Sequence, residues 1–130
     1  MSTESFGVKQ SFKAAADYSD KQYYLMYISA SETVTICGEK GLVIGIMYGK
    51  PELGAYGDVL TAPGVMAKVI VGDTVAAGDL LESDSAGRAV AFTYASGGTH
   101  ETYTVGRAVT GGAENGIITV LTGFCLAGKS

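Results

Sequence analysis

Residues 64–72, GVMAKVIVG, decide how this chain folds, because their side chains alternate with a period of two. One face carries only apolar side chains, those of Val65, Ala67, Val69 and Val71. The opposite face carries Met66, Lys68 and Ile70. Successive side chains of a strand point to opposite faces, so this pattern predicts a β-strand with two different faces.

The same kind of signal recurs along the chain from Tyr23 onward. Short apolar or alternating runs occur at 23–29, 33–37, 41–49, 58–62, 64–72, 79–83, 88–94, 103–110 and 116–123. Turn residues separate them, and no run has the length and period of an amphipathic helix. The run 41–49, GLVIGIMYG, is apolar on both faces and predicts a central strand. We therefore predict an all-β fold of about nine short strands, a compact and mostly antiparallel β-barrel or β-sandwich.

Residues 1–20 have only weak periodicity, and we predict an extended or loosely helical N-terminal arm there. Residues 21–130 are then a single domain. The arm carries four scattered large apolar side chains, those of Phe6, Val8, Phe12 and Tyr18. We expect no place for them in a compact barrel, so they are candidates for gripping a neighbouring protein by strand addition. The alternative is that the arm packs on its own domain.

Composition excludes several classes of function. The chain has 130 residues and a net charge of −4, without a basic cluster, so we expect it to bind neither nucleic acid nor an anionic membrane. Cys37 and Cys125 lie far apart, and with His100 they are too few for a zinc site. We expect two buried free thiols in a soluble protein made in a reducing cytoplasm, since no apolar signal segment opens the sequence.

Residues 123–130, GFCLAGKS, match the phosphate-binding pattern G-x-x-x-x-G-K-[ST]. That pattern functions where a strand leads into the loop and a helix follows it. The surrounding strands and the end of the quoted sequence at Ser130 leave no such helix, so we interpret the match as chance.

Three other patterns also have structural interpretations. Glycines at 41, 45 and 49 are expected to allow bending or close approach of a strand. Residues 65–69, VMAKV, resemble the Met-Lys hairpin of biotin and lipoyl carriers, but Ala67 intervenes and the lysine lies within a strand. The V-x-x-G-D-x-L run at 75–81 is expected to be a turn at Gly78 and Asp79.

Catalysis finds no support in the sequence. His100 lies in a Gly- and Thr-rich stretch, where we expect an exposed loop, and no carboxylates pair with it by spacing. We predict no catalytic residue, no cofactor and no metal.

Three segments together resemble the head decoration, or capsid cement, proteins of tailed bacteriophages. They are AAADYSDKQYYLMYI at 14–28, VAAGDLLESDSAGRAVAF at 75–92 and VGRAVTGGAENGIITVLT at 105–122. The resemblance spans residues 13–122. It implies a structural virion protein on the outer surface of an expanded head, bridging major capsid proteins as a homotrimer and stabilising the shell against the pressure of packaged DNA. Such a protein is made in the cytoplasm of the host bacterium.

With that function, the candidate interface with the capsid or a neighbouring subunit comprises the aromatic and apolar residues near the N-terminus: Phe6, Val8, Phe12, Tyr18, Tyr23 and Tyr24. The tyrosines at 23, 24 and 27 are expected in the core and the subunit interface. Two other functions stay open, the base of a head fibre and a carbohydrate-binding module. For the latter, residues 92–103, FTYASGGTHETY, offer Tyr94 and Tyr103.

Overall fold

A computed structural model describes residues 9–38, 42–92 and 102–127 of the chain. Within these ranges the chain is all-β, as the sequence predicts, and no helix is long and apolar enough to cross a bilayer. There are ten strands: β1 Lys9–Ala14, β2 Leu25–Ala30, β3 Thr33–Ile36, β4 Gly45–Met47, β5 Tyr56–Leu60, β6 Met66–Ile70, β7 Leu80–Ser83, β8 Ala89–Ala91, β9 Thr102–Ala108 and β10 Ile117–Ala127.

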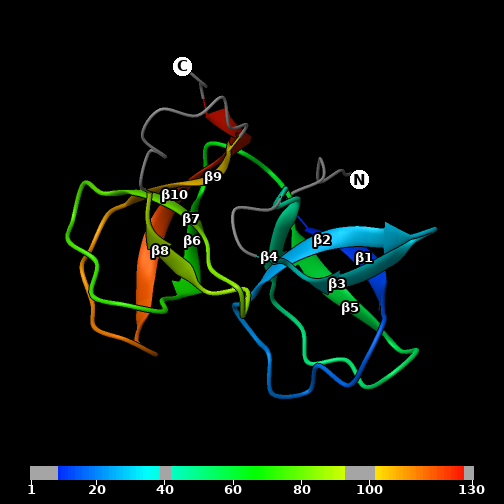
Figure 1. Ribbon diagram of the computed structural model, residues 1–130. Coiled ribbons are helices and arrows are strands. Elements are labelled where there is room, and N and C mark those ends of the chain that lie inside the picture. Colours follow the sequence, from blue (N-terminus) through cyan, green and yellow to red (C-terminus); the bar gives the residue numbers. More distant parts are fainter. Residues whose placement is uncertain (1–8, 39–41, 93–101, 128–130) are drawn as a thin grey trace, which may run out of the picture.

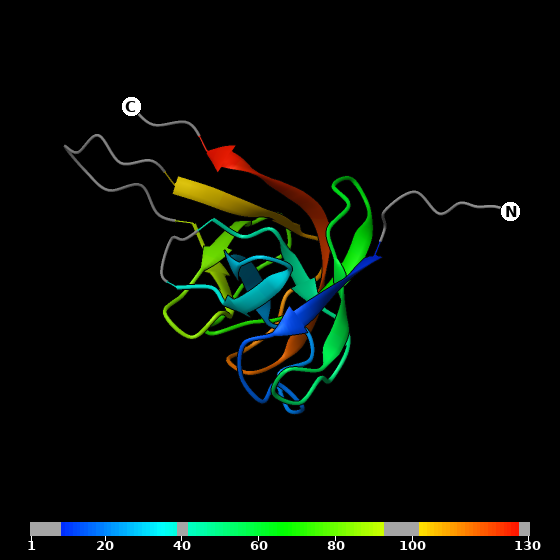
Figure 2. The same ribbon diagram turned by 90° about the vertical axis from the view of Figure 1, so that its right-hand side faces the viewer.

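The strands form two units that pack against each other (Figure 1). Strands β1 to β5 close into a barrel in the order β1-β3-β2-β4-β5, and β6 to β10 form a sheet in the order β6-β10-β9-β7-β8. All paired strands are antiparallel except β1 and β3. Figure 2 shows the long strand β10 curving beside β9. The predicted all-β class and the barrel are therefore confirmed, and five of the strands form a separate sheet that packs on the barrel.

The start of β2 and the whole of β4 are apolar on both faces because these segments lie between two cores. Leu25 and Ile46 belong to the core that the barrel shares with the sheet, together with Val69 and Val120. The next residues along the chain point into the barrel, where Met26 and Met47 are completely buried. The prediction of a central strand within 41–49 is confirmed by β4, although β4 spans only Gly45–Met47.

We expected residues 1–20 to form an arm, but the described part of this segment, from residue 9 onward, belongs to the barrel. Residues Lys9–Ala14 form β1, which pairs with β5 along five residues and closes the barrel. Phe12 packs on the barrel core, and Tyr18 is 6% exposed with its hydroxyl accepting a hydrogen bond from the Ile36 N–H at 3.3 Å. The barrel interior thus supplies the burial that we did not expect for these two side chains. Phe6 and Val8 lie outside the described residues.

The barrel also covers the outer edge of β6. The Tyr48 hydroxyl accepts a hydrogen bond from the Lys68 N–H at 2.7 Å, and the Tyr23 carbonyl accepts one from the Ile70 N–H at 3.1 Å. The rings of Tyr23 and Tyr48 pack edge to face with centroids 5.2 Å apart. These contacts satisfy two N–H groups on this edge of β6, so another strand cannot bind these two groups without displacing the barrel.

The turn between β7 and β8 joins the two units through Gly87. Its carbonyl accepts a hydrogen bond from the Leu25 N–H at 2.7 Å, which links the turn directly to β2. Gly87 has a φ of 79°, and a Cβ there would lie 2.5 Å from the Ile36 side chain and 3.2 Å from the Leu25 carbonyl. Both the backbone conformation and the close approach therefore require glycine.

We predict that Gly87→Ala lowers the free energy of unfolding by about 3 kcal/mol, combining left-handed strain with overpacking. Gly54→Ala is the matched control, because Gly54 has a φ of 80° but open space around its Cβ position. The control should lower it by about 1 kcal/mol. Urea unfolding of both variants measures the difference, and equal losses would show that the contact with β2 and β3 is unimportant.

Cys37 is a free, buried thiol at 1% exposure, as expected, whereas the side chain of Cys125 lies outside the described ones. Burial raises the pKa of Cys37 above 9.0, against the lowering effect of hydrogen bonds from Ser83 and the Gly38 backbone. A native pKa above the unfolded one means that unfolding releases a proton at high pH. The free energy of unfolding therefore falls as the pH rises from about 9 toward the native pKa.

We predict that Cys37 in a Cys125→Ser variant reacts with iodoacetamide at pH ~8 more than about tenfold more slowly in the native chain than in urea, because the thiolate is both rare and inaccessible. Mass spectrometry of timed aliquots gives both rates. Similar rates in the two conditions would contradict the burial of this thiol.

Candidate interaction surface

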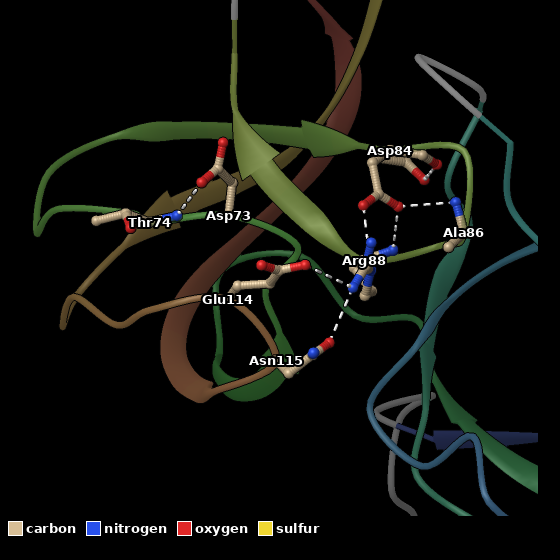
Figure 3. Close-up of polar contacts among 8 residues, drawn as sticks. Asp73, Thr74, Asp84, Ala86, Arg88, Glu114 and Asn115 are labelled. Atoms are coloured by element: carbon tan, nitrogen blue, oxygen red, sulfur yellow. Dashed lines mark hydrogen bonds and ion pairs between the residues drawn. The ribbon is translucent and has the colours of Figure 1, made fainter.

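The G-D-L-L-E-S-D-S-A-G-R-A-V motif at residues 78–90 links two turns of the structure (Figure 3). The Asp84 carboxylate accepts hydrogen bonds from the Ala86 N–H at 2.8 Å, from the Arg88 N–H at 2.9 Å and from Arg88 Nε at 3.2 Å. Arg88 Nη1 donates to Asn115 Oδ1 at 2.8 Å and lies 3.8 Å from Glu114 Oε2. One ion pair thus connects the β7–β8 turn to the β9–β10 turn.

The carrier-like patterns have the structural roles that the sequence predicts. Met66 and Lys68 lie within β6. The run 75–81 contains a turn that leads into β7, and the Asp79 carboxylate accepts a hydrogen bond there from the Ala76 N–H at 2.9 Å. Gly78 has a φ of 93°. Gly45 allows close backbone approach, since a Cβ there would lie 2.5 Å from the Leu60 carbonyl oxygen.

The phosphate-loop match also belongs to a strand. Residues 123–127 are part of β10, which pairs with β9 up to Ala127. The backbone N–H groups of this segment are therefore arranged for a sheet and not for a phosphate-binding loop. Residues 128–130 lie outside the described residues, as do His100 and Tyr94.

The described candidates for the interface do not form a common exposed surface. Phe12, Tyr23 and Tyr24 are partly buried and pack on the two cores, and Tyr18 is buried. The expected core role of Tyr23 and Tyr24 agrees with this placement. Tyr27 is 37% exposed. The interface role of these residues therefore stays a prediction, and Phe6 and Val8 lie outside the described residues.

Several exposed apolar side chains of the described residues lie on the outer face of β6, β10 and β9, which we call the outer sheet face. Alternation and register place seven residues of these strands on it, and Val109 follows directly after β9. The eight residues are Met66, Lys68, Ile70, Arg107, Val109, Ile117, Thr119 and Leu121. Leu121 pairs with Met66 on one side and with Arg107 on the other, and Ile117 pairs with Ile70. The opposite face of the same strands carries Ala67, Val69, Ile118 and Val120 of the core.

Large aliphatic side chains are unusually exposed on the outer sheet face. Met66 is 61% exposed, Ile117 55% and Leu121 45%. Contiguous apolar surface of this kind is characteristic of a surface that binds another macromolecule. The sequence contained a signal for this face. Large apolar side chains stand at alternate positions of each strand, Met66 and Ile70 on β6 and Ile117 and Leu121 on β10, opposite the side chains of the core. Sequence alone did not reveal that the two strands are neighbours.

The charged residues of the outer sheet face are both cations, although the chain carries a net charge of −4. Lys68 is exposed in the middle of β6. Arg107 is exposed on β9, where its Nη1 also donates to the Gly78 carbonyl at 3.0 Å. This face therefore combines aliphatic surface with positive charge, unlike the chain as a whole.

Tyr56 is an exposed aromatic side chain on the barrel. Tyr56 is 57% exposed and donates a hydrogen bond from its hydroxyl to Glu32 at 3.3 Å. It borders an open hollow of about 480 Å³ between residues 49 and 58, which Lys50, Glu52 and Asp58 also line. The mixed charges and open shape of this hollow define no specific ligand.

The fold is that of an all-β domain in which a closed barrel packs on a five-stranded sheet. It is similar to the crystal structure of the head fiber gp8.5 N base in bacteriophage phi29, with a TM-score of 0.70 and 20% sequence identity. The likeness covers 93% of this chain and 98% of that one. No protein-family model and no curated protein matches the chain.

We predict that Asp84→Ala lowers the free energy of unfolding by about 3 kcal/mol, because it leaves Arg88 Nε and two backbone N–H groups without the acceptor that they have in the native chain. Asp73→Ala is the control, since the Asp73 carboxylate is exposed and accepts a hydrogen bond from the adjacent Thr74 N–H at 2.7 Å. Its effect should stay below about 1 kcal/mol. Urea unfolding that gives the two variants the same stability would contradict the linking role of Asp84.

Proposed function

We propose that this chain is an accessory protein of a tailed-phage head that binds the outside of the assembled shell and holds neighbouring shell proteins together. The observation that carries the proposal is the likeness to a head-fibre base over nearly the full length of both chains. The sequence resemblance to head decoration proteins over residues 13–122 points independently to the same location. The partners are the major capsid protein and further copies of this chain, in a homotrimer.

The mechanism is mechanical. Packaged DNA pushes outward and tends to separate the shell proteins. A rigid domain that binds across a junction prefers the closed lattice, and it stabilises that lattice in proportion to its differential affinity. Several modest contacts combined in one trimer raise the overall affinity by roughly 10² to 10⁴. The two cores and the covered edge of β6 supply the rigidity that such a brace requires.

A second candidate function is the base of a head fibre, and the neighbour's own role as an N base favours it. A base anchors a further structure on the shell, whereas a cement protein acts by itself. The two functions predict different defects in heads that lack the chain. Loss of fibres with unchanged resistance to heat indicates a base, and loss of resistance to heat with unchanged appearance indicates cement.

We predict that the purified chain co-sediments with expanded heads and not with precursor heads, because a site spanning several shell proteins is aligned only after expansion. Saturating expanded heads with the chain should raise the temperature at which they release DNA, as expected for a ligand of the closed lattice. A dye that fluoresces on DNA follows this release. Absence of binding would contradict the proposal, and binding without a change in release would contradict the cement role.

A further inference from the structure

We propose that the outer sheet face is the surface that docks on the shell, and that its partner is an apolar patch of the shell protein bordered by Asp or Glu side chains. This inference rests on the proposed function and assigns a residue-level surface to it. It places the main contact on the sheet and not on Phe12 and Tyr18, which pack in the barrel core. A contact by Phe6 and Val8, which lie outside the described residues, stays a separate prediction.

The apolar part of the face supplies the affinity. Met66 and Leu121 are direct cross-strand neighbours, and Ile117 lies further along the same strand as Leu121. Their side chains stand on a sheet whose backbone is already fixed by hydrogen bonds to neighbouring strands. Docking therefore removes aliphatic surface from water with little additional ordering of the chain, which is the condition for efficient association.

The edge of the sheet does not offer an alternative mode of binding at this position. Strand addition needs free N–H and C=O groups on an edge strand. On β6, the N–H groups of Lys68 and Ile70 already donate to Tyr48 and Tyr23 of the barrel. A partner at β6 is therefore bound through the side chains of the face.

The positive charges of the face favour a partner whose surface carries negative charge. Lys68 and Arg107 lie among the aliphatic side chains, and the eight residues of the face include neither Asp nor Glu. A second copy docked by the same face in a two-fold arrangement would bring these cations toward one another, which is unfavourable. An acidic border on the partner would complement them. The eight residues also include no aromatic ring on which a nucleic-acid base stacks, so the face does not fit nucleic acid.

The test measures binding of the chain to expanded heads assembled from the shell protein encoded by the same genome. The face variant carries Lys68→Glu and Arg107→Glu, and the control variant carries Lys13→Glu and Lys50→Glu on the barrel, with the same change of net charge. We expect the face variant to bind at least about tenfold more weakly than the wild type and the control to bind within about threefold of it. Wild-type affinity should fall with rising salt, and the face variant should lose this dependence.

Lys68→Glu alone keeps the hydrogen bond from Arg107 to Gly78, and its thermal unfolding shows whether the fold is intact. This single variant should still bind more weakly than the control. Leu121→Ser should weaken binding as well, without a change in the salt dependence. Unaltered binding of folded Lys68→Glu and Leu121→Ser would overturn the inference.

The remaining outcomes separate this inference from the proposed function. Wild-type chain that does not bind heads overturns both. Wild-type chain that binds, with a face variant that binds equally well, overturns only the assignment of the face. Sedimentation of the free chain addresses a second copy as the occupant: a wild-type oligomer that Leu121→Ser converts to monomer would overturn the assignment of the shell as the partner.

Discussion

The rest of the structure depends on how the β7–β8 turn packs against the barrel. The Asp84 carboxylate holds the turn by accepting hydrogen bonds from residues 86 and 88, and this places Gly87 against Leu25 and Ile36. Arg88 then links the same turn to the β9–β10 turn through Asn115. The barrel and the sheet are consequently fixed to each other at the end where β10 begins, and β10 carries part of the outer sheet face.

The stretch at 75–92, which resembles the head decoration proteins, therefore has a structural role in this chain. Asp84, Gly87 and Arg88 act inward, on the relative position of the two units. They hold in place the sheet whose outer surface is formed by β6, β10 and β9. The function that we propose is mechanical, so the residues that define the shape matter as much as those that touch the partner.

The sequence predicted where the strands lie in the chain better than it predicted which strands pair with each other. Alternation identified β6 and β10, and the doubly apolar run around Ile46 identified β4 as central. Strand β1 was missed because its inward-facing Phe12 and Ala14 lie among polar residues, and a pattern of two apolar positions is too short to recognise. Its closure of the barrel depends on pairing with β5, more than 40 residues away in the chain. The outer sheet face was missed for the same reason, since Met66 and Leu121 become neighbours only through the pairing of β6 with β10.

A density map of expanded heads saturated with this chain tests the central claim most directly. The account predicts that the chain lies across a junction between shell proteins, with Met66, Ile117 and Leu121 against the shell and with acidic shell residues opposite Lys68 and Arg107. A map in which the face of β6, β10 and β9 is turned toward solvent, or in which each copy contacts a single shell protein, would contradict it.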